Sequence, residues 1–343
     1  MPPLPRGTPD IEIPPSLVAA HGTYFGAAGR PWLGALPALA RSCLRRWELR
    51  LDGPAGSGAV ALVLPVRRLD GSPAVLKLQP VDEETAGEPA ALRAWDGDGA
   101  VRLLAHDPGS GSMLLERLDA GRSLGGVVDE EAALTTLCEL LLRLNAPPAP
   151  AGTRRLADIA ADLLDRASRA GAGAGLDAGV RAGSRARLGA GSGDVRALIG
   201  CCAGALAEVA GDGCGDRLLH WDLHYDNVLA PLPDGDRRAP WLAIDPKPLA
   251  GDPAFELLPA LHNRWDGVLA TGDVTRAVLR RFDLMTDVLG LDRPGAVAWT
   301  LARVLENLLW AAERDDGSAH LDPDRAIAEA LLTHRAGVVR PLL

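Results

Sequence analysis

Hydrophobic and polar positions alternate along the first third of the chain. This period of two is typical of strands with one buried face. Five segments follow it: Glu48–Leu51, Ala59–Val66, Ala74–Leu78, Val101–His106 and Ser112–Arg117. Asp70 and Gly71 form a hairpin signal between two of them. We therefore predict an antiparallel sheet of five strands.

One helix is predicted within this sheet region, from Asp82 to Trp95, with Asp82 as its cap and Pro89 as a break or second start. A further segment of helical spacing runs from Leu36 to Trp47. Residues 1–31 are rich in Pro, Gly and Ala, and we expect an extended arm over the surface. Apolar positions in this arm offer a means of docking it: Ile11, Ile13 and Leu17.

After residue 120 the apolar spacing is that of helices. The predicted helices are Asp129–Asn145, Arg154–Arg169, Asp194–Ala210, Pro253–Arg264, Asp273–Leu289, Arg293–Arg314 and Asp322–Arg335. Residues 171–193 are a low-complexity Gly, Ala, Arg and Ser stretch, for which a solvated loop is the simpler interpretation and contact with substrate the alternative. The pattern indicates an α+β protein, sheet first and helices second.

Composition narrows the class of protein. No apolar run is long enough to cross a bilayer, and the first residues lack a secretory signal, so we expect a cytoplasmic enzyme without a membrane partner. The formal charge of −9 disfavours nucleic acid and mildly favours a cationic partner. Five cysteines without a C-x-x-C pair argue against both a disulfide framework and a zinc site.

Lysine is nearly absent from the chain. Only Lys77 and Lys247 occur, and every other basic residue is arginine. This composition suggests that the two lysines lie where a compact ammonium is needed, although chance also explains so small a number. Lys77 lies in a predicted strand, where a kinase places its phosphate-binding lysine. A helix carboxylate should pair with it, and we favour Glu88 over Glu84.

Two further segments are candidates for nucleotide contacts. Residues 53–58, which end in Ser57 and Gly58, form a glycine-rich loop two strands ahead of Lys77. Such a loop lets backbone amides approach phosphates, but it is equally interpreted as an ordinary hairpin. The extended run that contains Glu116 and Leu118 leaves the sheet where a linker offers backbone groups to an adenine ring.

The strongest chemical signal lies between His220 and Asp245. Asn227 follows Asp222 by five residues, and a hydrophobic strand then ends in Asp245. Phosphoryl transfer to a hydroxyl needs one carboxylate at the attacking oxygen and two oxygen ligands for Mg²⁺, and this pattern supplies all three. A polar loop whose Asp and Asn cap turns would not also supply the strand lysine and the second aspartate in order. His220 and His224 are expected to be hydrogen-bonded structural residues, since no partner has zinc spacing.

With these residues aligned, the chain resembles the aminoglycoside phosphotransferases, and in detail their streptomycin 6-phosphotransferase and hydroxyurea phosphotransferase branch. The resemblance is carried by residues 219–229 and 241–253, with weaker support at 94–104, 114–118 and 270–273. It covers most of the chain from about residue 16 to 315.

The resemblance implies a protein-kinase-like fold in two lobes, with ATP in the cleft between them. Residues 1–118 would form the nucleotide-binding lobe and residues 119–343 the helical catalytic and substrate-binding lobe. Asp222 would be the catalytic aspartate, Asn227 and Asp245 would ligate Mg²⁺, and Lys77 with Glu88 would hold the nucleotide phosphates.

Two departures from the family pattern stand out. The loop through Ser57 lacks a full glycine pattern, and Glu256 occupies a position where we expect Asp in relatives. If that residue braces the catalytic loop, its longer side chain must be accommodated.

The acceptor is less constrained. Streptomycin carries two guanidinium groups, which suit carboxylates and aromatic faces. Candidate acceptor residues are Asp226, Glu256, Trp265, Glu306, Trp310 and Glu313. Glu306, Trp310 and Glu313 share a helix face, which an ordinary exposed charged surface also explains, and core packing is the simpler role for each tryptophan.

Three functions remain open at this point. The first is an ATP-dependent streptomycin kinase that confers antibiotic resistance. The second is a kinase of the same fold for hydroxyurea or an endogenous sugar. The third is a nucleotide-binding pseudokinase, against which Lys77, Asp222, Asn227 and Asp245 argue together.

Overall fold

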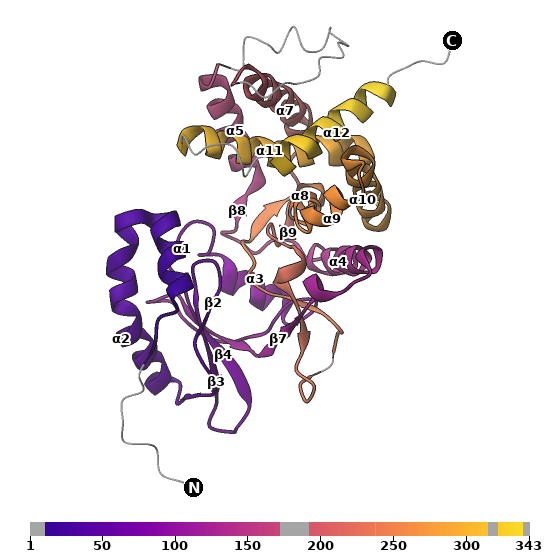
Figure 1. Ribbon diagram of the computed structural model, residues 1–343. Coiled ribbons are helices and arrows are strands. Elements are labelled where there is room, and N and C mark those ends of the chain that lie inside the picture. Colours follow the sequence, from indigo (N-terminus) through magenta and orange to yellow (C-terminus); the bar gives the residue numbers. More distant parts are fainter. Residues whose placement is uncertain (1–10, 172–191, 237, 315–321, 339–343) are drawn as a thin grey trace. The chain divides into compact units, whose positions relative to one another are not determined.

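The computed structural model describes residues 11–171, 192–236, 238–314 and 322–338. Contacts divide the chain into two units, Met1–Gly121 with Ala230–Ile244, and Arg122–Leu229 with Asp245–Leu343. The first unit contains the sheet and the second is mainly helical (Figure 1). Assignment of nucleotide binding to residues 1–118 and of catalysis to residues 119–343 stays a prediction. Most of the low-complexity stretch 171–193 lies outside the described residues.

An antiparallel sheet forms the centre of the first unit. Its strands run in the order β1-β3-β4-β6-β5, and β2 pairs with β3. The bounds are Arg50–Leu51 (β1), Gly56–Ser57 (β2), Leu62–Arg67 (β3), Pro73–Leu78 (β4), Leu103–Asp107 (β5) and Ser112–Glu116 (β6). The five predicted strands are present, and the glycine-rich loop adds β2 because residues 56 and 57 fold back onto β3. Lys77 lies in β4, opposite Val63 and Met113.

Three helices lie in the described part of this unit, where the sequence predicted two, one beside the sheet and one from Leu36 to Trp47. They are α1 (Pro15–Phe25), α2 (Arg30–Arg46) and α3 (Glu88–Trp95). The prediction of an extended arm is wrong for residues 15–25, because burial of Leu17 and His21 stabilises a helix that Pro and Gly content concealed. The predicted docking is confirmed, since Ile11 and Leu17 join α2 and the sheet in one apolar core.

The start of α3 differs from its prediction. Asp82 caps a turn, in which its carboxylate accepts from the Glu84 and Thr85 backbone amides, and the helix begins at Glu88. Pro89 lies in the first turn, where a missing N–H costs nothing, so it marks the second start considered above.

Three short strands connect in the order β11-β10-β7. They are Leu118–Ser123 (β7), Val228–Pro231 (β10) and Leu242–Ala243 (β11). In the first unit the Ala243 N–H donates to the Gly99 carbonyl, and its own carbonyl accepts from the Val101 N–H. These bonds fix the strand that immediately precedes Asp245.

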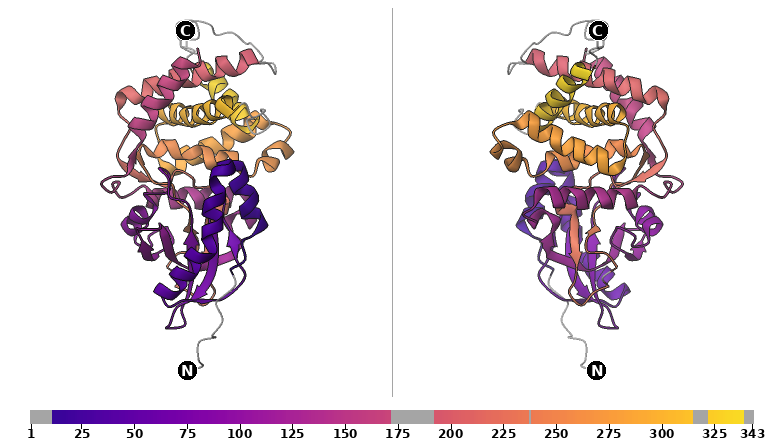
Figure 2. Two further views of the ribbon diagram at one scale, coloured as in Figure 1. Left: turned by 90° about the vertical axis from the view of Figure 1, so that its left-hand side faces the viewer. Right: turned by 90° about the vertical axis from the view of Figure 1, so that its right-hand side faces the viewer.

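The second unit is built around α11. In the described part of the chain, α5, α7, α8 and α12 contact it, and Figure 2 shows the ribbon from two further sides. The helices are α4 (Glu130–Leu144), α5 (Leu156–Arg169), α7 (Ser192–Asp212), α8 (Leu257–His262), α9 (Trp265–Ala270), α10 (Val274–Leu289), α11 (Arg293–Arg314) and α12 (Asp322–Val338). A small sheet joins β8 (Arg154–Arg155), β12 (Leu249–Gly251) and β9 (Arg217–Leu219). All seven predicted helices are found, although the segment predicted from Pro253 to Arg264 is a 3₁₀ turn followed by α8, and α9 was not predicted.

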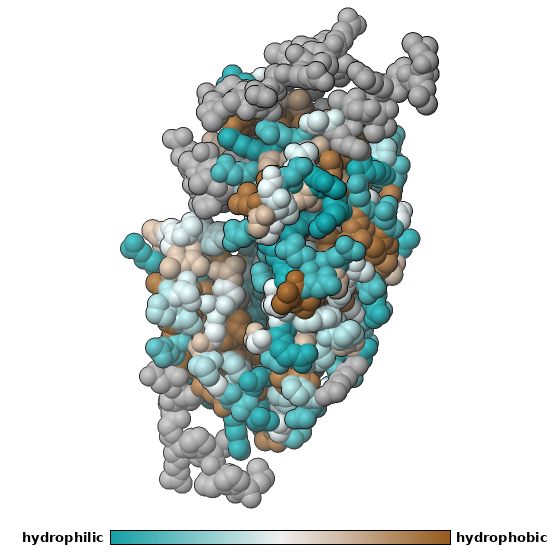
Figure 3. All heavy atoms as spheres, turned by 45° about the vertical axis from the view of Figure 1, so that its right-hand side comes forward, coloured by the Kyte–Doolittle hydropathy of each residue, from teal (hydrophilic) through white to brown (hydrophobic). Residues whose placement is uncertain are grey.

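Polar and apolar side chains both reach the surface on the face shown in Figure 3. Within the described ranges, none of the helices combines the length and apolarity that crossing a bilayer requires. All five cysteines are free thiols, and burial raises the pKa of Cys138 to about 12.

Candidate active site

The catalytic segment lies in the second unit, between β9 and a 3₁₀ turn at Tyr225–Asn227. The Asn227 side chain turns back and donates its Nδ2–H to the Asp222 carbonyl at 2.9 Å. The five-residue spacing therefore closes a short loop that brings the Asn227 side chain to the main chain of Asp222. The rings of His220 and His224 accept from the Asp222 and Asp226 backbone amides, so the expected structural role of both histidines is confirmed.

Two residues of the candidate site have a left-handed backbone conformation. Trp221, which precedes Asp222, has φ 67°, and Asp245 has φ 57°. Left-handed backbone is costly for residues other than glycine, and such residues cluster where a site is held in a fixed geometry.

Glu256 supports the segment before Asp222 through hydrogen bonds to its backbone. Its carboxylate is fully buried and accepts from the backbone amides of His220 at 2.6 Å and Trp221 at 3.0 Å. Burial raises the pKa of Glu256 to about 7, although these two donors oppose the rise. The prediction that Glu256 contacts the acceptor is wrong, because no solvent-exposed part of it remains; the other suggestion, a loop brace, is what the structure shows.

A lysine contacts the predicted base. The Lys247 ammonium lies 3.4 Å from the Asp222 carboxylate, and the Lys247 backbone N–H donates to the His220 carbonyl at 3.0 Å. The segment after Asp245 is thereby attached to the segment before Asp222. Sequence analysis singled out Lys247 by composition, but spacing did not reveal this contact.

Two arginines surround Trp221, and no sequence signal identified them. The guanidinium of Arg303 lies 4.4 Å from the centre of the indole ring, and that of Arg154 lies 4.6 Å from it. Arg303 also pairs with Glu306. The indole ring next to Asp222 in the chain therefore lies against two guanidinium groups.

The Lys77 site lies in the first unit. Its ammonium is 2.7 Å from one oxygen of Glu88 and 2.9 Å from the other, and Gln79 also donates to Glu88. Of the two carboxylates considered, Glu88 is the partner. Both charged side chains are almost fully buried, at 5% and 1% exposure. β4 and α3 are thus joined by a desolvated ion pair beneath the sheet surface.

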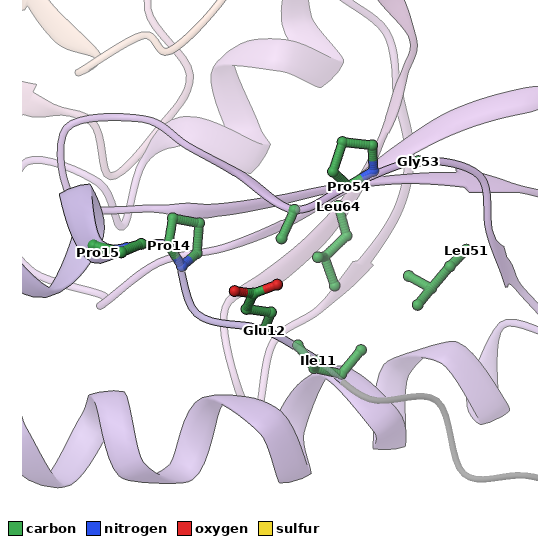
Figure 4. A pocket seen from close by; sticks show the side chains of 9 residues that line it. Ile11, Glu12, Pro14, Pro15, Leu51, Gly53, Pro54 and Leu64 are labelled. Atoms are coloured by element: carbon green, nitrogen blue, oxygen red, sulfur yellow. The ribbon is translucent and has the colours of Figure 1, made fainter.

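The glycine-rich loop is held by α1. The Ser16 and Ser57 hydroxyls are 2.8 Å apart, and the His21 ring contacts the Val60 carbonyl at 2.9 Å. The Gly58 N–H donates to the Ala61 carbonyl, so it faces the hairpin rather than a ligand. A hollow of about 320 Å³ borders the start of this loop (Figure 4). It is lined by Ile11, Glu12, Pro14, Pro15, Leu51, Gly53, Pro54, Ala55 and Leu64.

The linker candidates are also constrained in the first unit. The Glu116 carboxylate accepts two hydrogen bonds of 2.7 Å from Arg238, and the Glu116 N–H donates to the Arg102 carbonyl. Leu118 is buried at the start of β7. Contact of this segment with an adenine ring stays a prediction. Because the Glu116 N–H is already bonded to Arg102, other backbone groups of the segment would have to make that contact.

The remaining acceptor candidates fall into two groups. Asp226 accepts from Asn263 at 3.2 Å, and half-buried Trp265 begins α9 two residues later in the chain than Asn263. The other three lie on α11 and become more exposed along it: Glu306, Trp310 and Glu313. Glu313 is held by Arg166 at 2.8 Å, so its charge is already matched.

The donor set fits a magnesium ion. Because the Asn227 amide nitrogen is donating to the main chain, its carbonyl oxygen remains as the ligating atom, and the Asp245 carboxylate belongs to the same unit. Mg²⁺ prefers oxygen ligands and is commonly held by one or two side chains plus substrate phosphates. Within the described part of the chain, no three His, Cys, Asp or Glu side chains converge as a metal cluster.

Comparison with known proteins supports the same chemistry. A family model described as aminoglycoside/hydroxyurea antibiotic resistance kinase matches residues 46–317. A streptomycin 6-kinase of Streptomyces glaucescens is 51% identical, over 94% of this chain and 98% of that protein. A hydroxyurea phosphotransferase of Kitasatospora aureofaciens is 52% identical, over 95% and 87%. A streptomycin 6-kinase of Streptomyces griseus is 47% identical, over 94% and 97%.

Solved structures share the fold at low sequence identity. A macrolide 2'-phosphotransferase from Brachybacterium faecium aligns with TM-score 0.50 and 20% identity, covering 84% of this chain and 96% of its own. A choline/ethanolamine kinase family protein from Mesorhizobium loti aligns with TM-score 0.50 and 18% identity, covering 85% and 90%. The predicted protein-kinase-like α+β fold is therefore confirmed.

Proposed function

This chain belongs to the aminoglycoside/hydroxyurea antibiotic resistance kinases, and from that premise we propose that it transfers the γ-phosphoryl group of ATP to a hydroxyl of streptomycin, at position 6. Its chemistry is phosphoryl transfer to a small molecule from a nucleotide donor. The observation that carries the choice of acceptor is near full-length identity of 51% and 47% to two streptomycin 6-kinases. Phosphorylation would inactivate the antibiotic by adding charge to the hydroxyl.

The mechanism assigns a role to each residue. Asp222 accepts or orients the proton of the acceptor hydroxyl, and its exposed carboxylate edge and the buried brace beneath it suit this task. Asn227 and Asp245 would hold Mg²⁺, which neutralises charge on the nucleotide phosphates when bound. Lys77, oriented by Glu88, would hold those phosphates. Ser57, Gly58, Glu116 and Leu118 line the segments proposed to contact the nucleotide.

Acceptor binding is proposed for the second unit. Asp226 and Glu306 offer carboxylates close to the catalytic loop, since Asp226 belongs to it and Glu306 pairs with the Arg303 that stacks on Trp221. Trp265, Trp310 and Glu313 are proposed as outer contacts. The formal charge of −9 is compatible with a cationic small molecule rather than nucleic acid. We place the reaction in the cytoplasm, where ATP is available.

Hydroxyurea is the second candidate acceptor. The observation that favours it is 52% identity to a hydroxyurea phosphotransferase. This acceptor is small and uncharged, so it would need no acidic pocket. An endogenous sugar or natural product of similar size is accommodated by the same chemistry.

The test is an ATP-consumption assay with Mg²⁺ and streptomycin, other aminoglycosides or hydroxyurea, followed by mass spectrometry of the product. We expect streptomycin to gain one phosphoryl group. Turnover of hydroxyurea alone would establish the second candidate, and ATP binding without turnover of any acceptor would favour a pseudokinase.

Asp222→Asn tests the mechanism within the same assay. The substitution keeps the shape of the side chain and removes its charge, so turnover should fall by several orders of magnitude while Mg²⁺·ATP still binds. Full turnover in this variant would exclude Asp222 as the base.

A further inference from the structure

Lys247 is placed at the reacting end of the catalytic loop. Its ammonium lies 3.4 Å from the Asp222 carboxylate, and its side chain is 38% exposed. Its backbone N–H is anchored to the His220 carbonyl at 3.0 Å, so the residue belongs to the frame of the loop. Lys247 is one of only two lysines in the chain.

The geometry of phosphoryl transfer defines where the migrating group must be. The acceptor oxygen has to lie within hydrogen-bond reach of Asp222, about 3 Å. The phosphorus lies about 3 to 3.5 Å beyond that oxygen in a reactive arrangement. The phosphoryl oxygens are then within about 7 Å of the carboxylate, and an ammonium on a flexible four-carbon stem beside the same carboxylate reaches them.

We propose that Lys247 is a catalytic residue that contacts the phosphoryl group during its transfer. This inference rests on the proposed function. The acceptor oxygen forms a bond to the γ-phosphorus as the bond to the bridging oxygen of ADP breaks, and Asp222 takes the hydroxyl proton. Lys247 keeps its own proton throughout and stabilises negative charge on the phosphoryl oxygens, an interaction that is stronger in the transition state.

Two structural roles explain Lys247 less well. Other side chains support the loop, since Glu256 accepts from the backbone amides of His220 and Trp221 and Asn227 donates to the Asp222 carbonyl, whereas Lys247 is joined to the loop through its backbone N–H. Stacking on Trp221 is weak, since the ammonium is 5.8 Å from the ring centre, whereas two guanidiniums lie at 4.4 and 4.6 Å.

The first test combines Lys247→Met with Asp222→Ala. Methionine keeps the length and apolar character of the stem and removes only the charge. Alone, Lys247→Met should lower kcat by about 10²- to 10³-fold with little change in the KM of the acceptor. In the Asp222→Ala background it should still weaken Mg²⁺·ATP binding by roughly five- to ten-fold, measured by calorimetry. A lysine that only orients Asp222 has nothing left to orient there, so loss of the effect in that background overturns the proposal.

A matched control is Arg169→Met, which removes one cation of an exposed ion pair with Asp165 on α5. It should change neither kcat nor nucleotide affinity. Lys247→Arg keeps the charge but changes its shape, and partial activity between wild type and Lys247→Met is expected.

The second test uses the scarcity of lysine. Lys77 is only 5% exposed, so an amine-selective reagent followed by peptide mapping should modify Lys247 far faster than Lys77. Mg²⁺·ATP should protect Lys247, and the acceptor alone should not. Two results would overturn this inference and leave the proposed function intact, provided that the wild type phosphorylates an acceptor. The first is full activity of Lys247→Met, and the second is a failure of Mg²⁺·ATP to protect Lys247. Wild-type protein that binds no ATP overturns the proposed function and the inference with it.

Discussion

Glu256 is the residue whose burial has the clearest physical consequence. Its pKa is raised to about 7 from an ordinary 4.5, chiefly because its carboxylate is desolvated, and despite two backbone donors. At a pH between these two pKa values, Glu256 is therefore protonated in the folded protein and ionised in the unfolded chain. By linkage, the corresponding stability is present below pH 4.5 and is lost as the pH rises to about 7.

Glu256→Gln isolates this effect because glutamine does not titrate. The free energy of unfolding of the wild type, minus that of the variant, should fall by roughly 3 kcal/mol between the lower and the higher pH. Denaturant titrations at several pH values measure this difference. A difference that is constant across the range would mean that Glu256 does not titrate as a buried group.

The pairing of β4 with α3 is the element-scale counterpart. Glu88→Ala takes away the carboxylate that contacts the buried Lys77 ammonium, and removing one partner of such a pair typically costs about 3 to 5 kcal/mol. Mg²⁺·ATP should restore part of this loss, because its phosphates supply negative charge to Lys77. Thermal unfolding with and without nucleotide measures both effects. Glu83→Ala, an exposed residue on the turn before α3, is the control and should change stability by less than about 0.5 kcal/mol.

Helix α1 is expected to tune the glycine-rich loop. Ser16→Ala removes the hydroxyl that contacts Ser57, and a hydrogen bond of this kind contributes about 1 kcal/mol. If the loop must be held to bind nucleotide, the KM for ATP rises roughly five-fold and the acceptor KM is unchanged. Tyr24→Phe is the control on the same helix, since it removes one hydroxyl from a side chain that is 52% exposed. An equal change in both variants would argue against a role for the contact.

The sequence predicted those elements whose signals lie in neighbouring residues, and it missed those that depend on contacts between residues far apart in the chain. Strands β3 and β4 were found because alternation and the Asp70 turn are local signals. Helix α1 was missed because its stability comes from burying Leu17 and from stacking His21 on Trp32, at 4.7 Å between ring centres. The role of Arg238 was missed for the same reason, since its partner Glu116 lies 122 residues away.

The motif residues of the site were predicted with more success than its surroundings. Asp222 and Asn227 are close in the sequence, so their spacing alone indicated the closed loop that the structure contains. The cations around Trp221 come from β8 and α11, and only the tertiary fold brings Arg154 and Arg303 to it. Local chemistry was therefore visible in the sequence, and the electrostatic environment that supports it was not.

At the scale of the whole molecule, net charge distinguishes the two candidate acceptors. The chain carries a formal charge of −9, which attracts a bis-guanidinium compound. Dissolved salt weakens this long-range attraction by screening it. Raising the ionic strength from about 0.05 to 0.5 M shortens the screening length from above 10 Å to below 8 Å. The KM for streptomycin should therefore rise roughly three-fold or more, since exposed carboxylates such as Asp226 are screened most.

The KM for uncharged hydroxyurea is the internal control, because no long-range attraction contributes to its binding. Any general effect of salt on ATP binding or on the fold would move both acceptors together, so the ratio of the two KM values isolates the acceptor pocket. Steady-state kinetics at saturating Mg²⁺·ATP across the salt series give this ratio. If streptomycin is turned over and the ratio of the two KM values does not change with salt, neutral contacts must recognise it. The carboxylates of α11 and the catalytic loop would then lose their proposed role.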